Sequence, residues 1–543
     1  MRVLSSLAAI ALAAASIAEA RSLQHVGKKM PQNARSIRSP PSLRNPERLK
    51  RQAGSNTIIP QNANTTKFAV DGTAIPDVDF DIGESYAGLL PISSSGNSSE
   101  LYFWFFPSSN VNASDEITIW LNGGPGCSSL EGLLQENGPF IWQYGTLKPV
   151  QNPWTWQNLT NMVWVEQPVG TGFSQGTPTA RSEEDVAEQF LGFWKNFIDT
   201  FGLQNRKTYV TGESYAGQYV PYIADAMLNT NDTTYYDVSG ILIYDPSVAD
   251  DTILEQIPAV PFLDYWGPLI PLNSSYNDYV HQKAESCGYN AYLEKYLVYP
   301  SAGQQPDSPD LPGNSDDCDV FDDIFNAALE VNPCFDIYQV ATTCPLLYDV
   351  LGFPGSIPYL PDGGEIYFNR TDVQKAINAP LQEWEECADG VLTRDTSLPS
   401  SLTALPRVIE RTNNVILAHG LLDMILIANG SALAIQNMTW NGARGFETKP
   451  SDEFFVPYHN DPSLSTLTAA GAMGTTHTER GFTFVTTALS GHMVPQYQPS
   501  AAYRQLEFLL GRISSLTERS DFTTQSGSGN FGNGAGNATM KVF

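Results

Sequence analysis

The chain has 543 residues, of which 42% are hydrophobic and 11% aromatic, so it has enough apolar material for a large folded core. It carries 58 acidic against 30 basic residues, a formal net charge of -28. A surface this acidic repels phosphate and argues against nucleic-acid binding. Beyond the first residues no apolar run is long enough to cross a bilayer, so we expect no membrane span.

Residues 1–20 have the pattern of a secretory signal peptide. Arg2 is followed by an apolar run from Val3 to Ile17 and then by Ala-Glu-Ala, a small-residue cleavage signal. An N-terminal core helix is the alternative. The pattern predicts a protein that is secreted to the extracellular space, with a vacuolar location as the second possibility.

Residues 21–51 are strongly basic and differ from the rest of the chain. They contain nine lysines and arginines against one acid, Glu47, and they end in the pair Lys50-Arg51. We predict a pro-segment that is removed by cleavage after Arg51. A basic arm that stays attached is the alternative.

Ten Asn-x-Ser/Thr acceptors lie beyond residue 51, and this number favours a glycosylated secreted or vacuolar protein. The acceptors are Asn64, Asn97, Asn112, Asn158, Asn231, Asn273, Asn369, Asn429, Asn437 and Asn537. At the other end, residues 514–543 are predicted to be a flexible tail, because the stretch from Gln525 to Asn537 is rich in Gly, Ser and Asn.

The chain has six cysteines, and a secreted protein would carry them into an oxidising compartment. No Cys-x-x-Cys pair is present that would favour zinc or redox chemistry. Structural disulfides are therefore the preferred interpretation, although six cysteines allow fifteen pairings. We expect no metal and no cofactor. The cysteines are Cys127, Cys287, Cys318, Cys334, Cys344 and Cys387.

Short apolar runs predict buried strands, each followed by residues that could take part in chemistry. A helical spacing of apolar residues over 183–201 lies between two of these runs. Alternating strands and helices predict a parallel α/β sheet with its active groups at the carboxyl ends of strands. The expected strands cover 117–121, 162–165, 208–211, 415–418 and 482–487.

The sheet is expected to come from residues 52–249 and 407–513. Residues 250–406 are rich in Pro, Asp and Tyr and hold five of the six cysteines, four of them by residue 344. We interpret them as an insertion, largely helical and stapled by disulfides, that sits as a cap on the sheet.

Ser214 follows the strand at 208–211 and precedes a predicted helix, in the sequence Gly212-Glu213-Ser214-Tyr215-Ala216. A nucleophile on a tight strand-to-helix turn needs small residues two positions before and after it. Gly212 and Ala216 meet this need, so Ser214 is the candidate nucleophile.

A serine nucleophile requires a histidine base and an acid that orients it, in the chain order serine, acid, histidine on this type of sheet. His492 follows a strong strand and a small-residue turn near the C-terminus, which makes it the candidate base. Asp423 and Asp245 compete for the role of the acid. Asp423 is preferred because it follows the strand next before the histidine strand.

The oxyanion of an acyl-transfer reaction needs two backbone N–H donors. One is expected from Tyr215, the residue after the nucleophile, and the other from the glycine-rich loop at 122–126. A phosphate cradle is the alternative for that loop, but the loop lacks the Lys-Ser/Thr ending.

Four segments together resemble the serine carboxypeptidase family, most closely its secreted fungal members. They are residues 120–138 (WLNGGPGCSSLEGLLQENG), 165–174 (VEQPVGTGFS), 211–221 (TGESYAGQYVP) and 491–495 (GHMVP). The resemblance spans roughly residues 70–513. It implies an α/β-hydrolase fold with a helical insertion, and an enzyme that releases single residues from the C-termini of peptides.

By position, the resemblance makes Ser214 the nucleophile, Asp423 the acid and His492 the base, with Gly124 and Tyr215 in the oxyanion hole. It also implies a disulfide between Cys127 and Cys387. The substrate carboxylate would be bound by a set of four residues. These are Trp120, Asn122, Glu136 and Glu213.

Two neighbouring glutamates can bind a carboxylate if one of them stays protonated, since crowding raises the pKa of a carboxyl group. This device favours activity at acidic pH. On the predicted helix Gly132 lies one turn before Glu136, and Glu131 and Gln135 lie on the adjoining strip. These two side chains could line the pocket for the departing residue, or Glu131 could face water.

Two other functions remain as alternatives. An esterase, lipase or acyltransferase on the same fold would share Ser214, Asp423 and His492 but would need no site for a carboxylate. A non-catalytic secreted glycoprotein would need none of these residues. The substrates expected are peptide or protein C-termini, and the sequence gives no oligomeric state.

Overall fold

The computed structural model describes residues 57–93, 99–313, 316–353, 355–356, 358–392, 394–459 and 469–525. The predicted signal peptide (1–20) and the predicted basic pro-segment (21–51) lie outside the described residues. The acceptors Asn97 and Asn537 also lie outside them.

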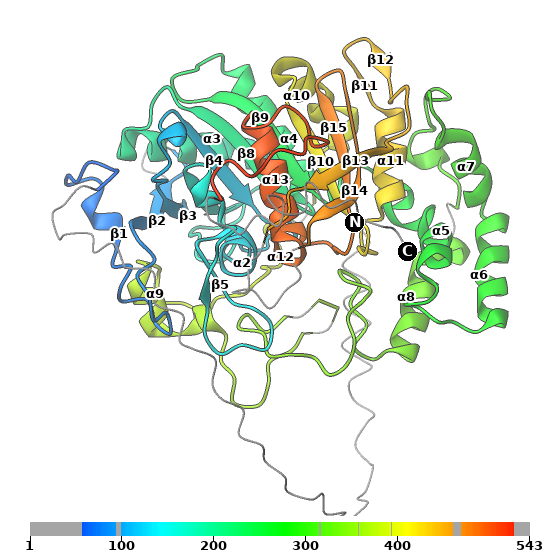
Figure 1. Cartoon of the computed structure of the whole chain (residues 1–543), viewed down its shortest axis with the longest axis horizontal. Helices are drawn as coiled ribbons and strands as arrows, with labels where there is room; N and C mark the ends of the chain where they lie inside the picture. Colours follow the sequence, from blue (N-terminus) through cyan, green and yellow to red (C-terminus); the bar gives the residue numbers. More distant parts are fainter. Residues whose placement is uncertain are drawn as a thin grey trace, which may run out of the picture. The chain divides into compact units, whose positions relative to one another are not determined.

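An 11-stranded sheet forms the centre of the molecule (Figure 1). Its order is β1-β2-β3-β7-β4-β8-β9-β10-β15-β14-β13, and the strands from β7 to β15 in this order are parallel to one another. The five strands expected from the sequence are β4, β7, β8, β10 and β15, which confirms the predicted parallel α/β sheet. The bounds are β1 Ala69–Val70, β2 Ser85–Pro91, β3 Glu100–Phe106, β4 Glu116–Leu121, β7 Met162–Glu166, β8 Lys207–Glu213, β9 Asp237–Tyr244, β10 Val415–Gly420, β13 Asp452–Val456, β14 Gly471–Glu479 and β15 Phe482–Thr487.

Both faces of the sheet are buried. Successive side chains of a strand point to opposite faces, so each strand contributes side chains to both. In β3, Leu101, Phe103 and Phe105 pack in one core cluster, and the residues between them pack in another. Helices α3 (Glu183–Phe201), α4 (Ala216–Asn229) and α10 (Ala404–Thr412) cover the first face. Helices α12 (Val494–Tyr497) and α13 (Pro499–Leu509) cover the second.

The predicted helix over 183–201 is confirmed as α3. The Ser182 side chain caps its first turn by accepting a hydrogen bond from the Asp185 N–H, and three acids lie in that turn. The helix ends at Gly202, whose φ of 67° places it in the left-handed region that favours glycine.

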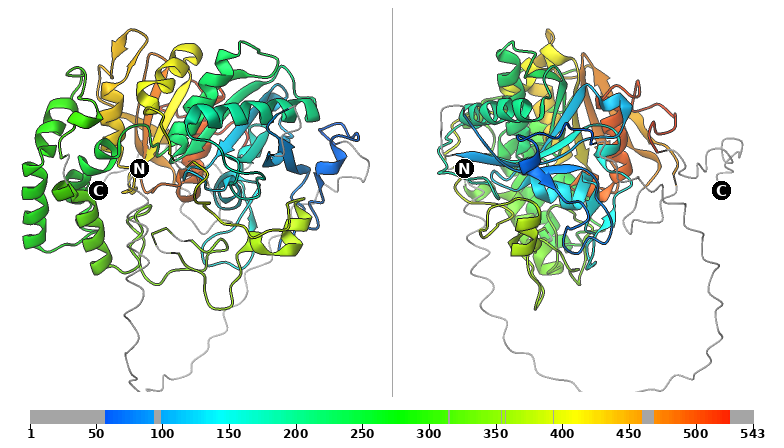
Figure 2. Two further views of the ribbon diagram at one scale, coloured as in Figure 1. Left: turned by 180° about the vertical axis from the view of Figure 1, so that it is seen from behind. Right: turned by 90° about the vertical axis from the view of Figure 1, so that its left-hand side faces the viewer.

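The expected insertion consists of two parts that pack in different places. Its first part forms a helical subdomain with its own hydrophobic cluster. Side chains from residues 350–384, among them Tyr367, Phe368 and Trp384, instead join the second core cluster of the sheet. Figures 1 and 2 show α9 (Thr371–Ala376) at the opposite end of the molecule from the helical subdomain. The subdomain contains α5 (Ala259–Trp266), α6 (Ser274–Ser286), α7 (Tyr289–Tyr296) and α8 (Val320–Val331).

The smaller elements connect these layers. They are α2 (Ser129–Glu131) with a π-helical stretch at Gly132–Asn137, α11 (Ala428–Asn437), the pair β5 (Phe140–Ile141) and β6 (Val150–Gln151), and the pair β11 (Thr439–Trp440) and β12 (Ala443–Arg444).

Residues 514–525 pack on the sheet domain, so the chain is held further along than the boundary expected for the flexible tail. Both the N–H and the hydroxyl of Thr523 donate to Glu507 at 2.6 Å, and the ring of Phe522 packs against Trp154. Only the part rich in Gly, Ser and Asn, from residue 526 on, lies outside the described residues.

Three disulfides join the six cysteines. Cys127–Cys387 links the glycine-rich loop to the segment after α9, whereas Cys287–Cys318 and Cys334–Cys344 lie within the expected insertion. Their sequence separations are 260, 31 and 10 residues.

We expect Cys127→Ser with Cys387→Ser to lower the melting temperature more than Cys334→Ser with Cys344→Ser. Closing the longer loop removes more entropy from the unfolded chain, a stabilisation of about 5.5 kcal/mol against about 2.7 kcal/mol for the shorter loop. Thermal unfolding of the two double variants measures the difference. A larger loss for the short-loop variant would contradict this account.

Candidate active site

Ser214 lies on a sharp turn between β8 and α4. Its φ of 63° is in the left-handed region, as expected for a nucleophile on a strained strand-to-helix turn. A β-carbon at Gly212 would lie 2.7 Å from that of Ala216 and would overlap the carbonyl of Leu121 on β4. The small residues at 212 and 216 are therefore required by packing.

His492 and Asp423 meet beyond the carboxyl ends of β15 and β10. The Nδ1 of His492 lies 2.8 Å from Asp423 Oδ2, and Oδ1 of the same carboxyl group accepts the N–H of Ile425 at 3.0 Å. Asp423 is 1% exposed and His492 3% exposed. This geometry fixes the His492 ring and leaves its Nε2 as the free nitrogen.

The Nε2 of His492 is buried and has no hydrogen-bond partner among the described residues. Ser214 lies at the same edge of the sheet, at the end of β8. Its hydroxyl makes no hydrogen bond to the His492 ring in the described structure. Hydrogen bonds of catalytic groups are often long before substrate binds. This Nε2 is the atom that would accept the proton of a serine hydroxyl.

Asp245, the competing acid, makes no hydrogen bond to His492 in the described structure. Its Oδ1 accepts the Gly420 N–H at 2.8 Å, and its side chain is fully buried next to Asp423. The geometry favours Asp423 as the partner of the histidine.

The glycine-rich loop lies directly against the turn that carries Ser214. A β-carbon at Gly123 would lie 2.8 Å from the β-carbon of Ser214 and would overlap the backbone N of Tyr215. Gly124 follows with a φ of 111°. The Cys127–Cys387 disulfide and a hydrogen bond from Ser128 N to Glu386 O hold the loop from the other side.

Asn122 is the centre of a buried polar cluster next to Ser214. Its Oδ1 accepts a hydrogen bond from Trp120 Nε1 at 2.7 Å, and its Nδ2 donates to Glu213 Oε1 at 3.0 Å. The same Nδ2 also donates to Glu131. Oxygens of Glu131, Glu136 and Glu213 lie within 4.8 Å of one another. The structure thus brings together all four residues expected to bind a carboxylate.

These three glutamates are shielded from water and have no ion pair with Lys or Arg in the described chain. Burial, followed by the charges of Glu213 and Glu131, raises the pKa of Glu136 well above its usual range. Burial raises the pKa of Glu213 to about 8. The cluster therefore holds protons at neutral pH and can donate hydrogen bonds to an anion.

Glu131 is a member of this cluster that the sequence did not assign to carboxylate binding. It was expected either to face water or to line a pocket, and the structure buries it at 7% exposure against Asn122. The sequence feature that could have indicated this role is the position of Glu131, which directly precedes Gly132 on the segment that also carries Glu136.

Tyr338 is a second residue that the sequence did not identify. Its backbone carbonyl accepts the His492 N–H at 2.8 Å, and its ring contacts the imidazole edge-to-face with centroids 5.1 Å apart. A β-carbon at Gly491 would overlap that carbonyl. Tyr338 comes from the expected insertion, so sequence order gave no hint of the contact.

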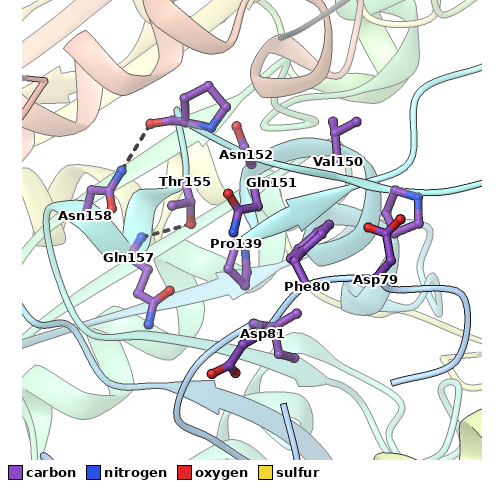
Figure 3. A pocket seen from close by; sticks show the side chains of 13 residues that line it. Asp79, Phe80, Asp81, Pro139, Val150, Gln151, Asn152, Thr155, Gln157 and Asn158 are labelled. Carbon is purple, nitrogen blue, oxygen red and sulfur yellow. Dashed lines mark hydrogen bonds between the residues drawn. The ribbon is translucent and has the colours of Figure 1, made fainter. Parts of the chain in front are cut away.

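An open pocket with a volume of about 680 Å³ lies elsewhere, near β5 and β6, and is lined by Asp79, Phe80, Asp81, Asn152 and Asn158 among others (Figure 3). None of the residues predicted to act in catalysis, in the oxyanion hole or in carboxylate binding lines it, although the predicted glycosylation acceptor Asn158 does. It is therefore separate from the candidate site.

The chain matches the serine carboxypeptidase family over residues 76–511. The chain belongs to this family. It is 58% identical over 522 residues to a probable serine carboxypeptidase of Arthroderma benhamiae, which covers 94% of this chain and 97% of that protein. It is 47% identical over 479 residues to serine-type carboxypeptidase F of Aspergillus niger, with 84% and 88% covered.

The carboxypeptidase is thus a serine-type hydrolase of peptide bonds, and it acts on peptide substrates. The crystal structure of Kex1, a prohormone-processing carboxypeptidase from Saccharomyces cerevisiae, superposes with a TM-score of 0.64 at 24% identity and covers 84% of this chain and 98% of that one. This likeness confirms the α/β-hydrolase fold. Among the described residues of the carboxypeptidase, no helix has the length and apolar character needed to cross a bilayer.

We expect the carboxypeptidase to lose stability as the pH rises from about 4.5 to about 8. Between the ordinary pKa of 4.5 and the raised pKa of about 8, Glu213 binds a proton in the folded chain but not in the unfolded chain. Urea unfolding at several pH values measures the slope. The Glu213→Gln variant should show a smaller slope than the wild type.

The matched control is Glu188→Gln, which changes an exposed glutamate on α3. It should leave the slope unchanged. An equal slope in wild type and Glu213→Gln would show that Glu213 is not protonated in the folded state.

Proposed function

We propose that Ser214, His492 and Asp423 form the catalytic triad of this carboxypeptidase. The free Nε2 of His492 takes the proton of the Ser214 hydroxyl, and the serine oxygen attacks the carbonyl carbon of the last peptide bond. His492 then passes the proton to the departing amine. Asp423 holds the ring by its 2.8 Å hydrogen bond and stabilises the imidazolium. Water releases the acyl group by the same steps.

The backbone N–H groups of Gly124 and Tyr215 are proposed to stabilise the oxyanion. The close approach of Gly123 to the Ser214 turn supports this, because it brings the glycine-rich loop to the start of α4. Donors fixed before the reaction need no reorganisation when the negative charge develops.

The buried cluster around Asn122 is proposed to bind the free carboxylate of the substrate, with Trp120, Glu136 and Glu213. The observation that carries this proposal is the set of unpartnered carboxyl oxygens in the described structure, namely both of Glu136 and Oε2 of Glu213. Buried polar atoms require partners, and a protonated carboxyl can supply an O–H to an anion. Glu213 precedes Ser214, so the bound carboxylate would lie next to the scissile bond.

Activity is proposed to be favoured at acidic pH over alkaline pH. Deprotonation of the Glu136 and Glu213 pair would place negative charges against the substrate carboxylate. The Michaelis constant for substrates with a free carboxylate should therefore rise as the pH passes about 8, where Glu213 loses its proton.

The protein is further proposed to be made as a secreted precursor, extracellular or vacuolar, with residues 1–20 as signal peptide and 21–51 as pro-segment. Six of the acceptors are exposed, which supports their glycosylation. Asn369 is a poorer acceptor, because it is only half-exposed and its Nδ2 donates to the Trp384 carbonyl at 3.1 Å. The exposed ones are Asn64, Asn112, Asn158, Asn231, Asn273 and Asn429.

We expect Ser214→Ala to lower kcat on an N-blocked dipeptide by about 10⁴-fold or more, with the fold unchanged. The wild type should cleave the free acid far better than the matching C-terminal amide, since only the acid binds the cluster around Asn122. Steady-state kinetics of both substrates measure this.

The Glu136→Gln variant is the matched test of the carboxylate site. It should reduce the preference for acid over amide while leaving the triad intact. An enzyme that cleaves blocked esters or amides as well as the acids would support an esterase or acyltransferase instead.

We expect Lys50→Ala with Arg51→Ala to block removal of the pro-segment. The dibasic pair is the proposed cleavage signal, and N-terminal sequencing of the secreted protein reads the result directly. The same mature N-terminus in the double variant would show that cleavage occurs elsewhere.

A further inference from the structure

Asp245 and Asp423 are two buried carboxyl groups that share one small space. They follow β9 and β10, which are neighbouring parallel strands, so their side chains meet at the same edge of the sheet. Asp245 is 0% and Asp423 1% exposed, and their oxygens lie within 4.8 Å of each other and of a His492 nitrogen. Two carboxylates this close in a dry site are not both ionised.

The hydrogen-bond donors show which of the two carries the charge. Asp423 accepts hydrogen bonds on both oxygens, from His492 Nδ1 and from the Ile425 N–H. Asp245 accepts one, from the Gly420 N–H on Oδ1. Its Oδ2 has no hydrogen-bond partner in the described part of the chain. Because donors stabilise the ionised form, Asp423 is the carboxylate and Asp245 is the acid.

His419 does not supply a positive charge that would let both carboxyls ionise. Its Nε2 lies 2.5 Å from the Leu426 carbonyl and 3.4 Å from Asp245 Oδ1. The side chain is fully buried, and burial lowers the pKa of His419 to about 4, so the ring is neutral. In the described structure, His492, Glu213 and Tyr244 also lie near enough to Asp245 to interact with it electrostatically. Burial and then the Asp423 charge raise the pKa of Asp245 well above its usual range.

We propose that Asp245 is a positioning residue that keeps its proton and donates an O–H hydrogen bond from Oδ2 to the Asp423 carboxylate. The proton stays on Asp245 throughout the reaction. The hydrogen bond holds Asp423 in the orientation that accepts His492 Nδ1–H, and this role rests on the functions proposed above for Asp423 and His492. When Asp245 is deprotonated at alkaline pH, repulsion between the two carboxylates displaces Asp423 and kcat falls.

The test compares the wild type with Asp245→Asn. Asparagine has the same shape, keeps an acceptor for the Gly420 N–H, supplies an N–H in place of the O–H, and tolerates the φ of 42° at this position. We expect kcat within about threefold of wild type at acidic pH, and a kcat that persists to higher pH than in the wild type, because the amide has no proton to lose.

Infrared difference spectroscopy reads the proton directly. The spectrum of wild type minus Asp245→Asn at neutral pH should contain the C=O band of a protonated carboxylic acid. The control is Asp225→Asn, a buried aspartate whose Oδ2 accepts from Arg407 Nη2 at 2.7 Å. Its difference spectrum should show an ionised carboxylate, and its alkaline limb of kcat should match the wild type.

The proposal is overturned if the Asp245→Asn difference spectrum contains no protonated-acid band. It is also overturned if folded Asp245→Asn loses about 100-fold or more in kcat at every pH, since the ionised form would then be required. A fully active Asp423→Asn variant would overturn the triad itself. The infrared band reports the Asp245 proton independently of that result.

Discussion

Buried carboxyl groups without a cationic partner constrain the whole candidate site. Glu131, Glu136 and Glu213 surround Asn122, and Asp245 lies beside Asp423, yet none of the five forms an ion pair with Lys or Arg in the described chain. Such groups keep their protons or share one negative charge among them. Protonated carboxyl groups allow an acidic protein to bind a carboxylate, and the loss of their protons lowers its stability as the pH rises.

The same constraint separates the two clusters by function. In the cluster around Asn122, unpartnered oxygens of Glu136 and Glu213 leave room for hydrogen bonds to a ligand. Around Asp423, the donors already present select one carboxylate and leave the neighbouring acid neutral. Each cluster needs burial, and burial comes from strand ends covered by other segments.

The burial of the candidate site depends on glycines that pack so closely against neighbouring segments that no side chain would fit there. Gly212 packs against Leu121 and Ala216, Gly123 packs against the Ser214 turn, and Gly491 packs against the Tyr338 carbonyl. The last contact joins the expected insertion to the histidine loop. The insertion therefore does more than cover the sheet, because one of its segments also fixes the backbone of His492.

The sequence by itself determined the parallel sheet, the turn at Ser214 and the family, because strand periodicity, small residues at fixed offsets and four local motifs are properties of short segments. It also proposed Asp423 over Asp245 from strand order. Only the tertiary structure revealed the burial of Glu131 against Asn122, the contact of Tyr338 with His492, the division of the insertion into two parts and the burial of Asp245 beside Asp423. These features depend on contacts between residues far apart in the chain, and on the exclusion of water that those contacts produce, which no local pattern records.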